Sequence, residues 1–128
     1  MKTQRASSQE VFEDYILINS TKSPYSQSSA NDAFEAALGA SNIGVKVKFV
    51  FSGLAKYQLF TQQQANKINR KNMLKRLSSL PLFEVEDIYL LSSQSTDESI
   101  DAESMKITLI EPEAFKSLCL NASQVLVF

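Results

Sequence analysis

The sequence predicts one α/β domain, built on a single, mostly parallel five-stranded sheet with helices on both faces. Its 128 residues give room for one core, since typical domains contain roughly 100–150 residues. Short apolar runs, typical of buried strands, alternate along the chain with segments of helical period. Because parallel neighbours need a crossover connection, this alternation favours parallel pairing. Residues 1–13 are polar and aperiodic, so we interpret them as a flexible N-terminal tail and residues 14–128 as the domain.

The first strand and the first helix are predicted between residues 15 and 39. The run from Tyr15 to Ile18 is continuously apolar, which indicates a strand buried on both faces. Ser29 with Asp32 fits a helix start, and Gly39 is expected to end the helix as its C-cap. Apolar residues in between recur with the spacing of one helix face, at Ala30, Ala33, Phe34, Ala37 and Leu38.

The central strand is predicted over residues 43–51. Its first half alternates apolar residues with lysines, and Val50 then breaks the alternation. We therefore expect one solvated face at the start of this strand and burial on both faces at its end. A helical turn is expected from Gly53 to Phe60, a polar loop at residues 62–69, and an amphipathic helix at residues 71–77 that ends before Pro81.

The second half of the chain contributes three more strands and one helix. The strands are predicted at residues 85–91, 106–110 and 125–128, with a polar, acidic loop at residues 92–104. Pro112 suits a first helical position and opens a helix that continues to Leu120. No internal repeat is found in the sequence.

Composition excludes several classes of function. A net charge of −1 argues against a broad nucleic-acid binder, so no direct nucleic-acid binding is expected. No apolar run reaches the roughly 20 residues of a membrane span, and the N-terminus lacks the apolar segment of a signal peptide. One cysteine forms no internal disulfide, and we expect a cytoplasmic protein. The absence of histidine removes the usual general base and the commonest zinc ligand.

Few residues are candidates for chemistry. With three glycines and no glycine-rich motif, a phosphate-binding loop is not expected, although Ser28 and Ser29 open a helix where an anion could bind. Cys119 falls near the C-terminus of a helix, on or beside its apolar face, which favours a buried structural residue over a reactive thiol. The basic stretch at residues 67–76 is typical of a solvated helix face, or of a contact with an acidic partner. Acidic residues at 84–87 and 97–103 lack metal-ligand spacing, so we predict no metal site and no cofactor.

Three stretches of the chain together resemble the TusC/DsrF proteins. Residues 23–30 (SPYSQSSA) are similar to the S-P-Y-G-S-x-x-A segment that follows the first strand in that family. Residues 71–89 resemble its helix followed by L-x-L-Y-D-I-E-x-x-Y/W, and residues 123–128 (SQVLVF) resemble its closing A-D-V-V-L-x-F. The resemblance covers about residues 14–128 and implies the DsrE-like α/β fold. Ser26 departs from the family pattern, which has glycine at that position.

The resemblance implies a subunit of a TusBCD-type sulfur-relay complex, which passes a persulfide toward 2-thiouridine at the tRNA wobble position. TusB-like and TusD-like subunits would be its partners in a hetero-oligomer. In the related TusD/DsrE subunit the sulfur-carrying cysteine follows the third strand, and the matching residues 90–93 of this chain contain no thiol. We therefore expect a non-catalytic subunit, since the cysteine sulfur itself holds the persulfide. The possible loop or interface residues are Pro24, Tyr25, Ser26, Ser28 and Gly53.

Alternative functions stay open from the sequence. Cys119 could itself carry sulfur, or the chain could belong to a dissimilatory sulfur-oxidation complex. A third possibility is a stand-alone module that binds a small anion with the loop between Asn19 and Ser29.

Overall fold

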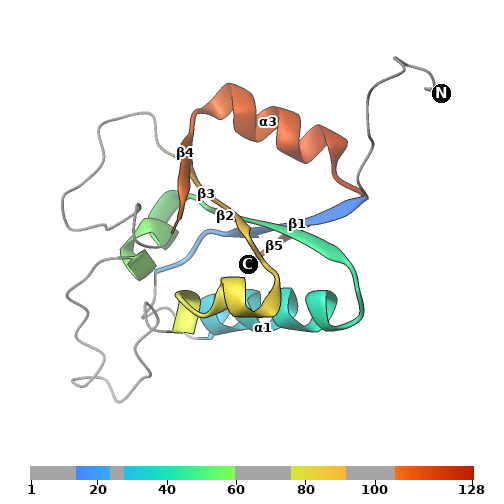
Figure 1. The fold of residues 1–128 in the computed structure, drawn as a ribbon. Helices are drawn as coiled ribbons and strands as arrows, with labels where there is room; N and C mark the ends of the chain where they lie inside the picture. The colour runs from blue at the N-terminus through green and yellow to red at the C-terminus, as the bar shows by residue number, and fades with distance from the viewer. Residues whose placement is uncertain (1–13, 24–27, 60–75, 92–105) are drawn as a thin grey trace, which may run out of the picture.

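The fold is a single sheet of five parallel strands in the order β4-β3-β2-β1-β5 (Figure 1). A computed structural model describes residues 14–23, 28–59, 76–91 and 106–128. The predicted tail, the polar loop and the acidic loop lie outside these residues, as does the helix at 71–77 except for its last two residues. The predicted fold class is confirmed. The strands are β1 (Tyr15–Ser20), β2 (Lys46–Phe51), β3 (Asp87–Leu91), β4 (Thr108–Ile110) and β5 (Gln124–Val127).

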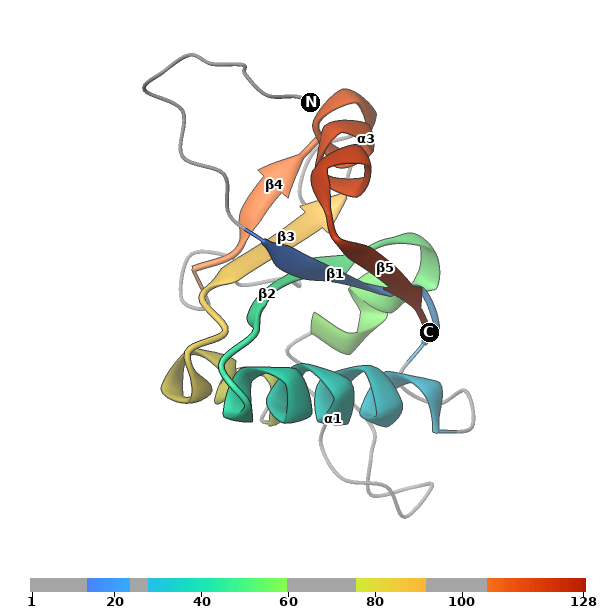
Figure 2. The same cartoon turned by 90° about the vertical axis from the view of Figure 1, so that its right-hand side faces the viewer.

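Helices cover both faces of the sheet, as predicted. The long helix α1 (Ser29–Asn42) lies on one face and α3 (Pro112–Asn121) on the other (Figures 1 and 2). Two short 3-10 helices add to the α1 side, because buried residues of both belong to the core on that face. They are η1 (Gly53–Leu59), which confirms the predicted helical turn, and η3 (Leu80–Phe83), which the sequence did not indicate.

The core is divided unequally between the two faces of the sheet. Side chains alternate along a strand, so Ile18 enters the large cluster under α1 while Leu17 enters a small cluster under α3. Helix α1 buries one face, made of Ala30, Ala33, Phe34 and Ala37, whereas no residue of α3 is fully buried. Helix α3 therefore covers the sheet only in part. Strand β2 follows its predicted pattern, exposed at Lys46 and buried on both faces from Phe49 to Phe51.

The end of α1 corrects one prediction. Gly39 does not end the helix, which continues to Asn42, and the left-handed residue is Gly44 at φ +86°. The carbonyl oxygen of Ala40 accepts from the backbone N–H of Ile43 at 3.2 Å and of Val45 at 3.0 Å, which closes the helix end. The chain then turns at Gly44 into β2. The helix also begins one residue early, with Ser28 rather than Ser29 as N-cap.

Other boundaries shift by a few residues. Strand β1 continues two residues past Ile18, because its pairing with β2 extends to Ser20 opposite Phe51. Strand β2 begins at Lys46, and Ile43, which was predicted to lie in it, is 79% exposed at the helix end. Val85 precedes β3 and is nevertheless buried, since it packs in the core just after η3.

Candidate functional site

The carboxyl ends of β1 and β2 meet in a set of polar contacts at the edge where open α/β sheets bind ligands. The Ser52 hydroxyl donates to Asn19 Oδ1 at 2.7 Å, and the Ser52 backbone N–H donates to the Ser20 carbonyl oxygen at 3.0 Å. Ser20 and Ser52 are both buried. These bonds fix the two strand ends to each other.

Gln58, fully buried on η1, completes this set of contacts. Its Nε2 amide donates to Ser20 Oγ and to the Lys22 carbonyl oxygen, both at 2.8 Å. Amides and hydroxyls do not ionise near neutral pH, so we interpret these side chains as groups that position the backbone and not as a general acid or base. The sequence analysis missed Gln58. Ser20 is the last residue of β1 and Ser52 directly follows β2, so a search for polar residues at the ends of buried strands could have found both.

Gly53 lies where β2 turns into η1. Its φ of +58° is in the left-handed region that glycine adopts without strain. A Cβ at this position would lie 3.5 Å from the Thr21 carbonyl oxygen, which is an ordinary contact distance. Conformation, and not shortage of space, therefore explains glycine at this strand end, close to the Asn19 and Ser52 pair.

The strand order reverses at β1, which has β2 on one side and β5 on the other. Thr21, one residue after β1, donates twice to the Phe128 carbonyl oxygen, from its backbone N–H at 2.8 Å and from Oγ1 at 2.7 Å. Doubly wound sheets bind ligands at this type of switch point. Here the two strand ends are instead tied directly to each other.

The end of β3 is the position at which the resemblance described above implies a sulfur-carrying cysteine in a TusD/DsrE subunit. Leu90 is buried and Leu91 half-buried, while Ser92 and Ser93 lie outside the described residues. Cys119 is in α3, where it packs beside the same small cluster as Leu91. It is half-buried and not fully buried as predicted, because α3 covers the sheet only in part. Burial raises the pKa of the Cys119 thiol, which disfavours the thiolate.

At the start of α1, the Asp32 carboxylate lies near the place where the sequence would allow an anion to bind. Ser28 is exposed, and its hydroxyl donates to Asp32 Oδ2 at 3.2 Å rather than to a backbone N–H. The Asp32 charge already interacts with the positive end of the helix dipole and would repel a second anion. Pro24, Tyr25 and Ser26, the other predicted loop residues, lie outside the described residues.

Arg76 is the described residue of the basic stretch, and it serves the packing of α1. Its guanidinium carbon lies 4.6 Å from the centre of the Phe34 ring, and Nη2 lies 2.9 Å from Glu35 Oε2. This residue therefore joins the segment before η3 to α1. Its charge is shared with Glu35 and does not form an isolated basic surface.

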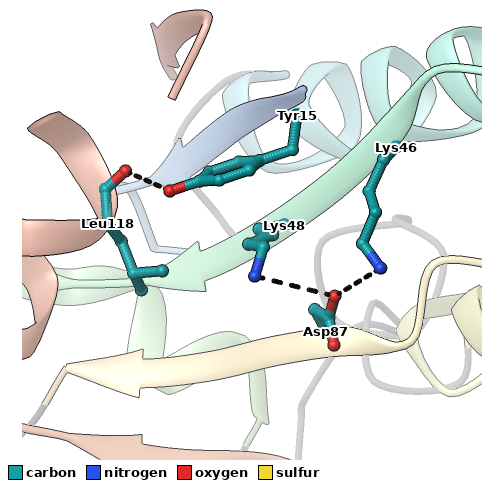
Figure 3. A network of polar contacts seen from close by, with 5 residues as sticks. All are labelled: Tyr15, Lys46, Lys48, Asp87 and Leu118. Carbon is teal, nitrogen blue, oxygen red and sulfur yellow. Dashed lines mark hydrogen bonds and ion pairs between the residues drawn. The ribbon is translucent and has the colours of Figure 1, made fainter. Parts of the chain in front are cut away.

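A second polar network lies on the α3 face of the sheet (Figure 3). The Tyr15 hydroxyl donates to the Leu118 carbonyl oxygen at 2.7 Å, which fixes β1 to α3. Lys48 Nζ lies 4.7 Å from the centre of the Tyr15 ring, and Asp87 Oδ2 lies 3.2 Å from Lys46 Nζ and 4.0 Å from Lys48 Nζ. The network stabilises the part of the sheet that α3 leaves uncovered.

A depression of about 480 Å³ opens beside this network, at the amino ends of β2 and β3. Lys46 and three carboxylates, those of Glu84, Glu86 and Asp87, are among its lining residues. Within the described ranges no three acidic, cysteine or histidine side chains are grouped to hold a metal ion. The depression also lies at the end of the sheet opposite to the usual ligand site.

Among the residues described, no helix is long and apolar enough to cross a membrane.

Comparison with known proteins gives the family. The model of the DsrE/DsrF-like family matches residues 14–128. The chain belongs to the DsrE/DsrF-like family. It is 26% identical over 113 residues to a TusC homolog of Pseudomonas aeruginosa, which covers 87% of this chain and 95% of that protein. A TusC homolog of Vibrio vulnificus is 24% identical over 107 residues, or 82% of this chain and 91% of the relative.

The fold of this DsrE/DsrF-like chain is also found in a solved structure. The crystal structure of the ychN protein from E. coli superposes with a TM-score of 0.71 at 18% sequence identity. The match covers 90% of this chain and 99% of the ychN chain. At this identity the likeness supports the fold alone, and it agrees with the single five-stranded parallel sheet described above.

Proposed function

We propose that this chain is a non-catalytic, TusC-like subunit of a cytoplasmic TusBCD-type sulfur-relay complex. In this role it would assemble with TusB-like and TusD-like subunits and support persulfide transfer toward tRNA wobble 2-thiouridine. Its similarity to TusC homologs over more than four fifths of the chain supports the assignment.

The observation that carries the proposal is the absence of cysteine at the end of β3. Residues 90–93 are Leu-Leu-Ser-Ser. A persulfide is held on a cysteine sulfur, so this position cannot carry sulfur in the way expected of a TusD-like subunit. The neighbouring strand ends agree with this reading, because the Ser52 hydroxyl and the Gln58 Nε2 amide donate to internal acceptors.

Exposed apolar surface supports a role in assembly. Leu120 of α3 is exposed, and so are Val125, Leu126 and Val127 of β5. Leu54 and Tyr57 add exposed side chains on η1, near the carboxyl edge where a partner's thiol would be presented. Apolar surface of this kind is typical of proteins that function in contact with other subunits.

Co-expression with the TusB-like and TusD-like proteins tests the proposal. One complex that contains all three chains is expected on size-exclusion chromatography. Incubation of that complex with a persulfide donor, followed by intact-mass measurement, should add sulfur to a partner chain and leave this chain unmodified. A chain that binds neither partner would refute the assembly role.

A Cys119-dependent sulfur carrier is the second candidate, since Cys119 and Leu91 pack beside the same apolar cluster. The Cys119→Ser variant separates the two functions. A relay that keeps its rate of tRNA thiolation with this variant supports the non-catalytic role. Loss of thiolation in a correctly assembled complex, with sulfur mass found on Cys119 in the parent chain, supports the carrier.

A further inference from the structure

Strand β5 forms an exposed apolar edge of the sheet, at the end of the strand order (Figure 2). Val125 is 40% exposed, Leu126 37% and Val127 64%. Leu120, in the last turn of the adjoining helix α3, is 74% exposed. The edge thus combines apolar side chains on both faces of the sheet, because Val125 and Leu126 point to opposite faces.

The backbone of this edge is oriented for a further strand. The Phe128 N–H donates to the Asn19 carbonyl oxygen at 2.9 Å, and the Phe128 carbonyl oxygen accepts from the Thr21 N–H at 2.8 Å. Both groups of Phe128 therefore point toward β1. Since backbone groups alternate along a parallel ladder, those of Val127 and Val125 point away from β1, toward the open edge.

This edge lacks the features that usually prevent strand edges from pairing. Residues 123–128 contain no charged side chain and no proline. The opposite edge is different, because β4 has only three residues and lies between Lys106 and Glu111. Lys106 also has a positive φ of 59°, which turns the chain just before the strand. The β5 edge is therefore the one suited to pairing.

We propose that β5 pairs antiparallel with β5 of a second copy of this chain, about a two-fold axis at Leu126. In this register Val125 faces Val127 of the second copy, and each of these pairs exchanges two hydrogen bonds through its outward backbone groups. The edge has no charged side chain, so two copies meet without repulsion between like-charged side chains. A two-fold contact uses the same patch on both chains and closes at two copies.

Helix α3 enlarges this contact beyond the strands. A two-fold axis perpendicular to the sheet keeps both α3 helices on the same face, so the exposed Leu120 of each copy flanks the junction. Stable interfaces bury roughly 800 Å² per partner, which is more than four strand residues supply. In the proposed dimer, the last turn of α3 with its exposed Leu120 would add to the area that the strands bury.

Light scattering on the purified full-length chain tests this pairing. The expected mass is about twice the chain mass of 14.3 kDa. Val127→Lys should weaken the dimer at least about tenfold, because it places two charges at the junction. The matched control is Leu109→Lys on the opposite edge, where Leu109 is 44% exposed, and it should leave the dimer intact. Circular dichroism checks that both variants stay folded.

Cross-linking tests the proposed axis. Leu126→Cys, made together with Cys119→Ser, brings two thiols opposite each other at a non-hydrogen-bonded pair and should give a disulfide-linked dimer on oxidation. Leu109→Cys in the same background should stay uncross-linked. A monomeric parent chain, an equal effect of the two lysine variants, or a dimer without the Leu126→Cys cross-link would overturn the proposal. The proposed pairing does not depend on the proposed function in sulfur transfer. A complex with TusB-like and TusD-like partners that holds only one copy of this chain would refute the pairing and leave the proposed function intact.

Discussion

Replacing Gln58 by methionine tests whether the carboxyl edge of the sheet is held by internal hydrogen bonds. Gln58 is fully buried on η1 and donates to Ser20 and to the Lys22 carbonyl oxygen. Methionine has a similar length and flexibility, so the change removes both donors with little change in volume. The strand ends of β1 and β2 keep their own contact through Ser52 and Asn19.

The magnitude follows from the burial of each acceptor. Ser20 is only 1% exposed, and a buried group that loses its partner costs about 1–3 kcal/mol. The bond to the Lys22 carbonyl oxygen is only part-buried, so we expect water to replace the second donor at a loss of about 0.5–1 kcal/mol. We expect Gln58→Met to lower the free energy of unfolding by about 2–3 kcal/mol, since the buried methionine offsets a part of these losses.

Urea denaturation measures this change, with Lys116→Met as the control. Lys116 is an exposed residue of α3, so its replacement should change stability by less than about 0.5 kcal/mol. Ser20→Ala and the double variant complete a mutant cycle, for which we expect a coupling energy of about 0.5–1.5 kcal/mol. A Gln58→Met variant as stable as the parent, or a cycle without coupling, would refute this account of the carboxyl edge.

The remaining predictions concern the two helices. Gly39→Ala should raise stability by about 0.5–1 kcal/mol in thermal denaturation, because Gly39 is inside α1 and an added Cβ meets no atom within 4 Å. Gly44→Ala should lower stability by about 1 kcal/mol, since its φ is +86°; the reverse order of these two signs would place the helix end at Gly39. Tyr15→Phe should cost about 1 kcal/mol through loss of the bond to Leu118, and unchanged stability would contradict that contact. Alkylation of Cys119 by iodoacetamide should reach its half-maximal rate at a higher pH in the native chain than in urea. The reason is that the thiolate is the reacting form, and burial raises the pKa of the Cys119 thiol in the native chain. A half-maximal rate at a lower pH in the native chain would reveal an activated thiol.

Hydrophobic periodicity was sufficient to predict the fold class. The helical spacing from Ala30 to Ala37 identified the face that α1 buries, and the broken alternation in residues 45–51 predicted where β2 becomes buried on both sides. These features are local, since each depends on which side of one element faces apolar neighbours. The order of strands and helices then favoured a parallel sheet.

The exact end of α1 was not available from the sequence. Gly39 and Gly44 are both suited to a left-handed helix end, and the sequence offers no local reason to choose between them. The choice depends on where β2 enters the sheet, with Lys46 opposite Tyr15. That register is a contact between distant segments, so the three-dimensional structure selects Gly44.

For the candidate site too, some features followed from the sequence and others only from the tertiary structure. The sequence by itself determined that no thiol follows β3 and that no histidine is present, because these are facts of composition and position. It did not determine that Gln58 is buried, since the partners of this side chain lie 36 and 38 residues away. The half-burial of Cys119 likewise depends on how far α3 covers the sheet. Tertiary structure decided both, because burial is set by the neighbours that folding brings together and not by the residue's own segment.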